Sequence, residues 1–125
     1  MNFLDTAFQN YDLAKKMLSL NVVDYYATKL LNVVKNNGTI FISGNAGAGS
    51  NAEHFVSELV GRFYKNRKPL PAISLNSDNA TITCIANDFG YENIFLRQIE
   101  GLFDADKDIY IGMSTSGNSP NILKV

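Results

Sequence analysis

Four hydroxyl groups fall within six residues near the end of the chain, in Ser114-Thr115-Ser116-Gly117-Asn118-Ser119. The segment follows an apolar run and precedes a predicted helix. Unpaired amides and the positive end of a helix dipole favour an anion, hydroxyl groups add donors without fixed charge, and Gly117 lets the backbone approach a ligand closely. We therefore predict that these residues, the Ser114–Ser119 loop, bind a phosphate group. The alternative is a capped turn in which Ser116 or Asn118 only caps the next helix.

His54 and Glu58 are four residues apart in a segment with helical periodicity, so their side chains can touch. The apolar residues of this segment form one stripe that we expect to face a sheet, and they are Ala52, Phe55, Val56, Leu59, Val60 and Phe63. At 100° per residue, His54, Glu58 and Gly61 fall on the opposite side. The pair could bind a metal ion, or Glu58 could move protons while His54 orients it. The commoner alternative is a solvated pair with neither role, and two ligands alone do not complete a zinc site.

A glycine-rich segment, Gly44-Asn45-Ala46-Gly47-Ala48-Gly49, follows another apolar run. It is not a P-loop, because no Lys-Ser or Lys-Thr pair follows the glycines. Its glycine spacings of three and then two also differ from the dinucleotide-binding G-x-G-x-x-G pattern. The segment either only makes a strand-to-helix turn or lets a ligand pass close over the backbone.

Asn87 and Asp88 form a third polar pair, whose default role is to cap the following helix. Cys84, the only cysteine, lies among apolar residues and is predicted to be a buried small hydrophobe. A single cysteine excludes an intrachain disulfide and a cysteine-based zinc cluster.

From Thr39 onward, apolar strands alternate with helices. The predicted strands are 39–43, 71–75 and 108–113, and the predicted helices are about 51–64, 79–86 and 94–102. This alternation predicts an α/β fold with a parallel sheet covered on both faces. Ligands of such sheets bind beyond the carboxyl ends of the strands. Both special loops belong at that edge.

Residues 1–37 are predicted to form two N-terminal helices that pack on the domain or on a neighbouring subunit, and residues 38–125 to form the domain itself. Asn36-Asn37-Gly38 ends the second helix, with the glycine as its left-handed residue. The last residues, 121–125, read as one turn of a helix. We therefore expect the C-terminal part of the domain to be missing.

Composition limits the partners. Apolar residues make up 46% of the 125 residues and charged residues 18%, a globular balance, and the net charge of −1 argues against nucleic acid and membrane surfaces. The N-terminus lacks the basic and apolar regions of a signal peptide. These features predict a soluble, cytoplasmic protein.

Five blocks of the sequence match one known family in the same order. They are Gly44-Asn45-x-Gly47, Asn51-Ala52-x-His54-Phe55-x-x-Glu58-Leu59-x-Gly61-Arg62-Phe63, Pro71-Ala72-Ile73, Asn87-Asp88-Phe89-Gly90 and the Ser114–Ser119 loop. In these residues the chain resembles the sugar isomerase (SIS) domain of phosphoheptose isomerases. The resemblance runs from the N-terminal helices to the last residue, and several ordered blocks are more specific than any single motif.

The resemblance implies a flavodoxin-like αβα sandwich that assembles as a homotetramer. It implies isomerisation of sedoheptulose 7-phosphate to D-glycero-D-manno-heptose 7-phosphate, which supplies heptose for bacterial lipopolysaccharide or capsule. By position, the sugar would be lined by Asn45, Ala46 and Gly47, and its hydroxyls would be bound by Asn87 and Asp88. The phosphate would be held by Ser114, Thr115, Ser116 and Ser119.

The resemblance also implies a zinc ion bound by His54 and Glu58. Glu58 would in addition be the acid/base that moves a proton between C1 and C2 through an enediol, and a metal or a well-placed donor would stabilise the developing oxyanion. The family's remaining site residues, a glutamine and a histidine, belong to a C-terminal segment beyond residue 125. The fragment is therefore expected to lack part of the catalytic apparatus.

The sequence departs from the family's Gly-Asn-Gly-Gly-Ser pattern at Ala46 and Ala48, and Asn51 stands where aspartate is common. The main alternative is a non-catalytic SIS protein that binds a replication initiator or senses a phosphosugar. Such relatives tend to lack a glutamate at the position of Glu58 and to interrupt the Ser-Thr-Ser run, so the isomerase hypothesis is favoured. A third alternative is another phosphosugar for the same chemistry.

Overall fold

The computed structural model describes residues 2–125. Its elements are α1 (Phe3–Met17), α2 (Leu20–Lys35), β1 (Ile40–Gly44), α3 (Gly47–Val60), β2 (Ala72–Ser74), α4 (Asn79–Phe89), the 3-10 helix η1 (Tyr91–Asn93), α5 (Leu96–Leu102), β3 (Ile109–Met113) and α6 (Pro120–Leu123). The chain divides into two compact units, one up to Asn32 and one from Val33 to Val125, and the division falls inside α2. The predicted division into N-terminal helices at residues 1–37 and a domain at residues 38–125 stays a prediction.

The two predicted N-terminal helices are present. Asn2 caps α1 through a reciprocal capping box, in which the Asp5 amide donates to Asn2 Oδ1 over 2.9 Å and the Asn2 amide donates to the Asp5 carboxylate over 3.3 Å. After α2, Asn37 rather than Gly38 adopts the left-handed conformation, with φ 56°. Glycine suits position 38 for another reason, because a Cβ there would collide with the carbonyl oxygen of Lys107.

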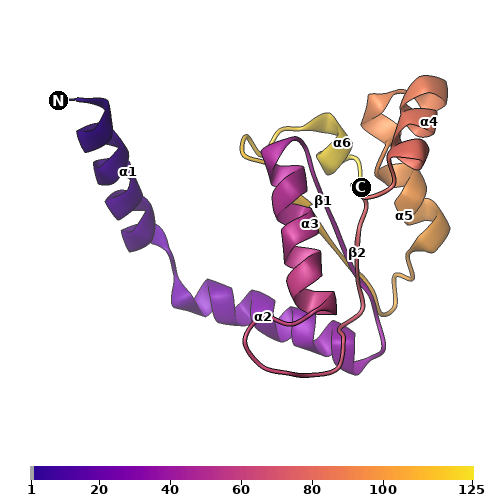
Figure 1. The fold of residues 1–125 in the computed structure, drawn as a ribbon, viewed down its shortest axis with the longest axis horizontal. Helices are drawn as coiled ribbons and strands as arrows, with labels where there is room; N and C mark the ends of the chain where they lie inside the picture. The colour runs from indigo at the N-terminus through magenta and orange to yellow at the C-terminus, as the bar shows by residue number, and fades with distance from the viewer. Residues whose placement is uncertain (1) are drawn as a thin grey trace. The chain divides into compact units, whose positions relative to one another are not determined.

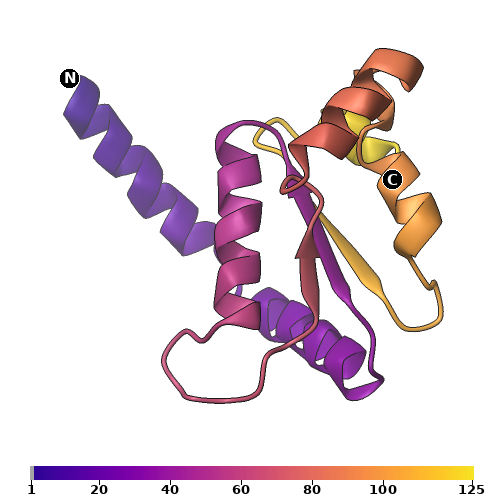
Figure 2. The ribbon, with the colours of Figure 1, turned by 45° about the vertical axis from the view of Figure 1, so that its right-hand side comes forward.

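The three strands form one parallel sheet in the order β2-β1-β3, seen nearly edge-on in Figure 1 and side by side in Figure 2. The central strand β1 is buried along its whole length. Ile40 pairs with Ala72 on one side and with Ile109 on the other, and Gly44 pairs with Met113. The ends of β1 and β3 are therefore level, so the segments that follow them start side by side.

Helices cover both faces of this sheet, with α3 on one side and α4 and α5 on the other (Figure 2). The main core lies between the sheet and the helices α4 and α5, where apolar side chains pack around the β1 residue Phe41. Its buried members are Phe41, Leu75, Ile85, Ile94, Phe95, Ile99 and Ile122. The predicted α/β fold with a parallel sheet between helical layers is confirmed.

The start of α3 differs from the prediction. The helix begins at Gly47, four residues before the predicted start, because the Ala48 amide already donates to the Asn45 carbonyl over 3.0 Å. A Cβ on Gly44 would lie 2.5 Å from the backbone of Ala48, so the glycine lets the helix start pack directly against the end of β1. The glycine-rich segment is therefore mostly a helix start and not an open loop.

The prediction that the whole apolar stripe of α3 faces the sheet is wrong. Ala52 is fully buried, but Phe55 and Val60 are 38% and 44% exposed, and Phe63 lies beyond the end of the helix. The neighbouring strand β2 has only three residues, so it covers little of the helix.

Two predictions for α4 also need correction. The helix extends to Phe89, so Asn87 and Asp88 lie in its last turn and do not cap the next helix; Gly90, at φ 89°, ends it. Cys84 is exposed, because α4 turns the neighbouring Ile85 into the core instead.

Among residues 2–125, no helix has both the length and the hydropathy needed to cross a bilayer.

Candidate functional site

Two loops that are distant in sequence meet at the carboxyl edge of the sheet. Asn45 follows β1, and the Ser114–Ser119 loop leads from β3 to α6. Asn45 Nδ2 donates to Asn121 Oδ1 over 2.9 Å, and Asn121 Nδ2 donates to Asn45 Oδ1 over 2.8 Å. The Tyr91 hydroxyl donates to the same Asn45 Oδ1 over 2.9 Å. A part-buried amide pair therefore joins the two loops, and η1 adds a third contact.

The serine hydroxyls of the Ser114–Ser119 loop converge. Ser114 Oγ lies 2.9 Å from Ser119 Oγ and 3.4 Å from Ser116 Oγ. Gly117, at φ 67°, turns the backbone so that its own amide donates to Ser114 Oγ over 3.1 Å. Three hydroxyl groups thus face one small region at the start of α6.

The capped-turn alternative for this loop is wrong in its detail. Ser119 occupies the N-cap position of α6, and its side chain makes no capping hydrogen bond. Ser116 Oγ instead accepts the Asn118 amide over 3.2 Å, inside the loop. Neither Ser116 nor Asn118 caps the helix. Pro120 has no amide hydrogen and the Ile122 and Leu123 amides donate to the Ser119 carbonyl, so among the described residues the Asn121 amide is the first-turn donor without a backbone acceptor.

A hollow of about 480 Å³ opens where these segments meet. It is lined by Asn45, Tyr91, Glu92, Ser119, Pro120 and Asn121. Asn45 and Ser119, which the family resemblance assigns to the sugar and to the phosphate, therefore line one cavity. We call it the Asn45–Ser119 hollow.

The turn after β1 is held on its other side by Asn76. The Gly44 amide donates to Asn76 Oδ1 over 3.0 Å, and Asn76 Nδ2 donates back to the Gly44 carbonyl over 2.8 Å. Ala46 sits in this turn at φ 49° and ψ −121°, a conformation that side chains disfavour. Its deviation from the family pattern thus falls at a position where glycine would be unstrained.

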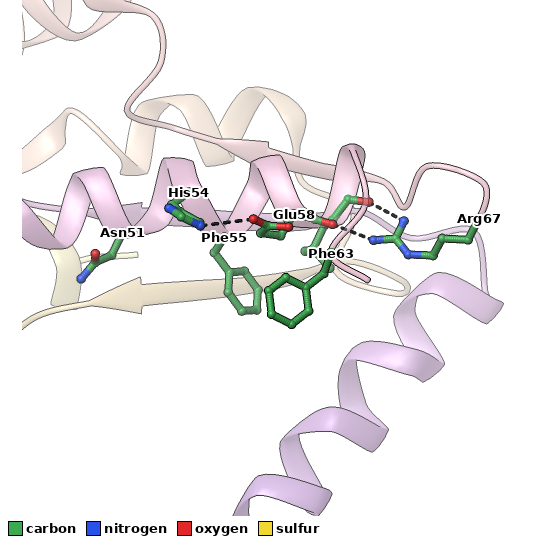
Figure 3. Close-up of a pocket in the computed structure, with 7 residues that line it drawn as sticks. Asn51, His54, Phe55, Glu58, Phe63 and Arg67 are labelled. Carbon is green, nitrogen blue, oxygen red and sulfur yellow. Dashed lines mark hydrogen bonds and ion pairs between the residues drawn. The ribbon is translucent and has the colours of Figure 1, made fainter. Parts of the chain in front are cut away.

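His54 and Glu58 lie together on α3, with His54 Nε2 3.3 Å from Glu58 Oε1 (Figure 3). The His54 side chain is 74% exposed and that of Glu58 35%. Both line a second hollow of about 560 Å³, together with Asn51, Phe55, Leu59, Phe63 and Arg67. The predicted pair is present, and the rings of Phe55 and Phe63 make an apolar wall beside it.

Arg67 anchors the far end of this second hollow. Its guanidinium donates to the carbonyl oxygens of Glu58, Leu59 and Lys68 over 2.6, 2.8 and 3.0 Å. The last carbonyls of a helix lack intrahelical donors, and a cation there also suits the helix dipole. Arg67 thus stabilises the turn of α3 that carries Glu58.

The structure does not bring all predicted site residues into one cavity. His54 and Glu58 lie seven and eleven residues beyond Gly47, the first residue of α3. At a rise of 1.5 Å per residue they are roughly 10 and 16 Å along the helix from the Asn45 turn. Asn87 Nδ2 donates to Asp88 Oδ1 over 2.7 Å, and in the described part of the chain neither residue hydrogen-bonds to the two loops.

Sequence reasoning missed four residues of this region. Asn121 and Tyr91 hold Asn45, Asn76 holds Gly44, and Arg67 caps α3. An asparagine two residues after the serine-rich loop was the available signal for Asn121. Tyr91 and Arg67 carried none, because their partners are backbone groups or distant side chains.

The chain is similar to known proteins along most of its length. A family model described as SIS domain matches residues 15–125. A phosphoheptose isomerase of Helicobacter pylori strain 26695 is 53% identical over 95 residues, 76% of this chain and 49% of the relative. A phosphoheptose isomerase of Fusobacterium nucleatum is 40% identical over 128 residues, 99% of this chain and 65% of the relative.

The fold is also similar to solved structures. A phosphoheptose isomerase from Neisseria gonorrhoeae superposes with a TM-score of 0.84 at 32% identity, over 97% of this chain and 61% of that one. One from Francisella tularensis gives a TM-score of 0.85 at 33% identity. The chain spans about half to two thirds of the length of the relatives it matches.

Proposed function

The chain belongs to the SIS domain family, and from this premise we propose that it carries the substrate site of a phosphoheptose isomerase. The reaction converts sedoheptulose 7-phosphate to D-glycero-D-manno-heptose 7-phosphate, a ketose-to-aldose isomerisation. The observation that carries the proposal is the convergence of three serine hydroxyls beside Asn45 at the carboxyl edge of the sheet. Relatives at 40–53% identity named for this activity support it.

In the proposal, the phosphate binds at the Ser114–Ser119 loop. Ser114, Thr115, Ser116 and Ser119 donate their hydroxyl hydrogens to phosphate oxygens, and the short contacts among the serines open to do so. The Asn121 amide at the start of α6 is one further donor; Pro120 has no amide hydrogen, and the Ile122 and Leu123 amides already donate to the Ser119 carbonyl. The sugar lies along Asn45, Ala46 and Gly47, and Asn87 and Asp88 bind its hydroxyls.

Glu58 is the proposed acid/base, and because it lies roughly 16 Å along α3 from the Asn45 turn of its own chain, it would act on a sugar bound by another copy of the chain. Its carboxylate removes the proton from C1 of the ketose, which gives an enediol, and returns the proton to C2 of the aldose, while the hydroxyl proton passes from O1 to O2. His54, 3.3 Å from the carboxylate, orients it. The rings of Phe55 and Phe63 line the same hollow and give it an apolar wall beside the pair.

His54 and Glu58 fit two positions of a zinc site, since an imidazole nitrogen and a carboxylate oxygen are both zinc ligands and lie within one ion's reach of each other. Within residues 2–125, no group of three or more histidine, cysteine, aspartate or glutamate side chains is placed to hold a metal. We propose that the further ligands come from outside these residues. Bound zinc would supply Lewis-acid polarisation of the substrate carbonyl.

The experiment measures heptose 7-phosphate formed from sedoheptulose 7-phosphate by the full-length gene product. Glu58→Gln keeps the shape of the side chain but removes the base, so kcat should fall by about 100-fold or more. A chelator should abolish turnover, and zinc should restore it. Product at background level in the wild type, with Glu58→Gln indistinguishable from it, would exclude the isomerase.

The same measurement distinguishes the isomerase from the main alternative, a non-catalytic SIS protein. Such a protein, which binds a replication initiator or senses a phosphosugar, would not convert sedoheptulose 7-phosphate, and Glu58→Gln would leave any affinity for it unchanged. The presence of Glu58 and of an uninterrupted Ser-Thr-Ser run favours the isomerase. We further propose a cytoplasmic homotetramer that supplies heptose for lipopolysaccharide or capsule, and light scattering of the full-length protein tests the tetramer.

A further inference from the structure

The Asn45 side chain has little hydrogen-bonding freedom. Its Oδ1 accepts from two donors, Asn121 Nδ2 at 2.8 Å and the Tyr91 hydroxyl at 2.9 Å. A carbonyl oxygen has two lone pairs, so both are in use. Of the two hydrogens on Asn45 Nδ2, one goes to Asn121 Oδ1 over 2.9 Å. The other hydrogen is the one polar group of this amide left for the hollow that Asn45 lines.

Asn121 is placed to hold this arrangement. It is only 2% exposed, although asparagine is usually a surface residue, and it lies in the four-residue helix α6 directly after the phosphate loop. Both of its hydrogen bonds to another side chain go to Asn45. A buried polar side chain costs free energy unless its partners are fixed, so the pair stays formed. The same pair would form with both amides flipped, and it is the Tyr91 hydroxyl, donating to Asn45 Oδ1, that selects this orientation.

We propose that Asn121 and Tyr91 are positioning residues that fix the Asn45 amide with its oxygen turned away from the ligand, so that Asn45 acts only as a hydrogen-bond donor. The inference rests on the proposed function for its ligand, a sugar phosphate. The group that Asn45 recognises is then an acceptor oxygen, such as a sugar carbonyl, hydroxyl or phosphate oxygen. An N–H group or a cation at that place is rejected, because no free oxygen of Asn45 faces it.

The arrangement also couples the two loops. Asn121 follows the phosphate-binding serines, and Asn45 follows β1, so one amide pair sets the position of the sugar contact relative to the phosphate contact. A variant that breaks the pair should therefore weaken substrate binding without touching the serines or Glu58. Uniform loss of binding raises KM and leaves kcat nearly unchanged.

The first test needs no ligand and no activity. In the full-length protein, nuclear magnetic resonance of the side-chain amides should show the Asn45 signal moving in both Asn121→Asp and Tyr91→Phe. Matched controls are Asn79→Asp and Tyr64→Phe, at exposed positions, which should leave that signal in place. An Asn45 signal that stays in place in both Asn121→Asp and Tyr91→Phe would overturn the positioning roles, whatever reaction the protein performs.

The second test uses sedoheptulose 7-phosphate. Asn121→Asp should raise KM about tenfold and Tyr91→Phe about threefold, with kcat within twofold of wild type. In an Asn45→Ala background, Asn121→Asp should add less than a further twofold, because residues that act through one another are not additive. Additive losses, or an unchanged KM, would contradict the inference. If the wild type has no isomerase activity, dissociation constants for the same sugar phosphate replace KM, and the two proposals are judged separately.

Discussion

At the level of single residues, the site consists of side chains that already bond to one another. Ser114 bonds to Ser119, Asn45 to Asn121 and His54 to Glu58. Such networks hold polar groups in place before a ligand arrives, which reduces the cost of ordering them on binding. Substitutions at these positions should therefore report on both binding and local strain.

Ala46→Gly should stabilise the protein. At φ 49° and ψ −121°, the backbone of an alanine is strained by about 1–3 kcal/mol, and glycine avoids this strain. The strain exceeds the additional conformational entropy that glycine loses on folding. The free energy of unfolding should rise by about 1 kcal/mol, measured by urea denaturation.

The matched control for that change is Ala48→Gly. Ala48 lies two residues further on, inside α3, where glycine is the poorer helix former and should cost about 0.5–1 kcal/mol. The two substitutions should therefore shift the unfolding midpoint in opposite directions. A lower midpoint for Ala46→Gly would show that the turn is not strained.

Ser116→Ala should weaken phosphate binding. Its hydroxyl lies 3.4 Å from Ser114 Oγ and faces the same region. Its loss should therefore make the binding free energy of sedoheptulose 7-phosphate less favourable by about 1 kcal/mol or more. Calorimetry measures this, with Ser77→Ala in the β2–α4 turn as the control. An unchanged affinity would reduce the loop to a structural connection.

At the level of elements, α3 is set at both ends by contacts outside its own helix. Gly44 and Gly49 let its start approach β1 and Asn76, and Arg67 binds carbonyls at its end. Between these ends, His54 and Glu58 share one exposed face. The position of the proposed acid/base therefore depends on how the helix is fixed, not only on its own sequence.

Arg67→Ala should destabilise the end of α3. The guanidinium donates to three carbonyl oxygens, and an exposed cap of this kind should contribute about 0.5–1 kcal/mol. Hydrogen exchange should become faster for the amides of the last turn, near Glu58. Arg62→Ala is the control, because Arg62 is exposed, and it should change the unfolding free energy by less than about 0.5 kcal/mol. If Arg67→Ala and Arg62→Ala lowered the unfolding free energy equally, Arg67 would have no capping role.

At the level of the whole molecule, the sheet joins residues that the chain separates. Ser43 is fully buried in β1, and its hydroxyl lies 2.7 Å from the hydroxyl of Tyr110 on β3. Burial raises the pKa of Tyr110, and the hydrogen bond with Ser43 partly opposes this. The stability of the folded protein should therefore fall at high pH, where Tyr110 ionises.

Tyr110 should make the protein less stable above pH 10. Its folded pKa is raised above its unfolded value of about 10, so its contribution is complete below that pH and is lost as pH rises through the folded pKa. Between pH 8 and pH 11, the midpoint temperature of thermal unfolding should fall less in Tyr110→Phe than in the wild type. At neutral pH that variant should lose about 1 kcal/mol, because buried Ser43 loses its partner; Tyr64→Phe, at an exposed ring, should not. An identical pH dependence in Tyr110→Phe and wild type would contradict this.

The sequence by itself determined the α/β class, the order of strands and helices, and the residue types that could do chemistry. Alternating apolar strands and helices follow from local periodicity, and His54 with Glu58 follows from a spacing of four. The resemblance to the SIS family was confirmed for the same reason, since its blocks lie in short stretches of chain.

The tertiary structure decided what those residues touch. Asn45 and Asn121 are 76 residues apart, and only the pairing of β1 with β3 brings them together. The burial of α3 and the placement of Asn87, Asp88 and Cys84 likewise depended on which face the sheet could cover. Periodicity describes one element at a time, whereas hydrogen-bond partners and burial come from the packing of several, and the amide pair that orients Asn45 belongs to that second kind.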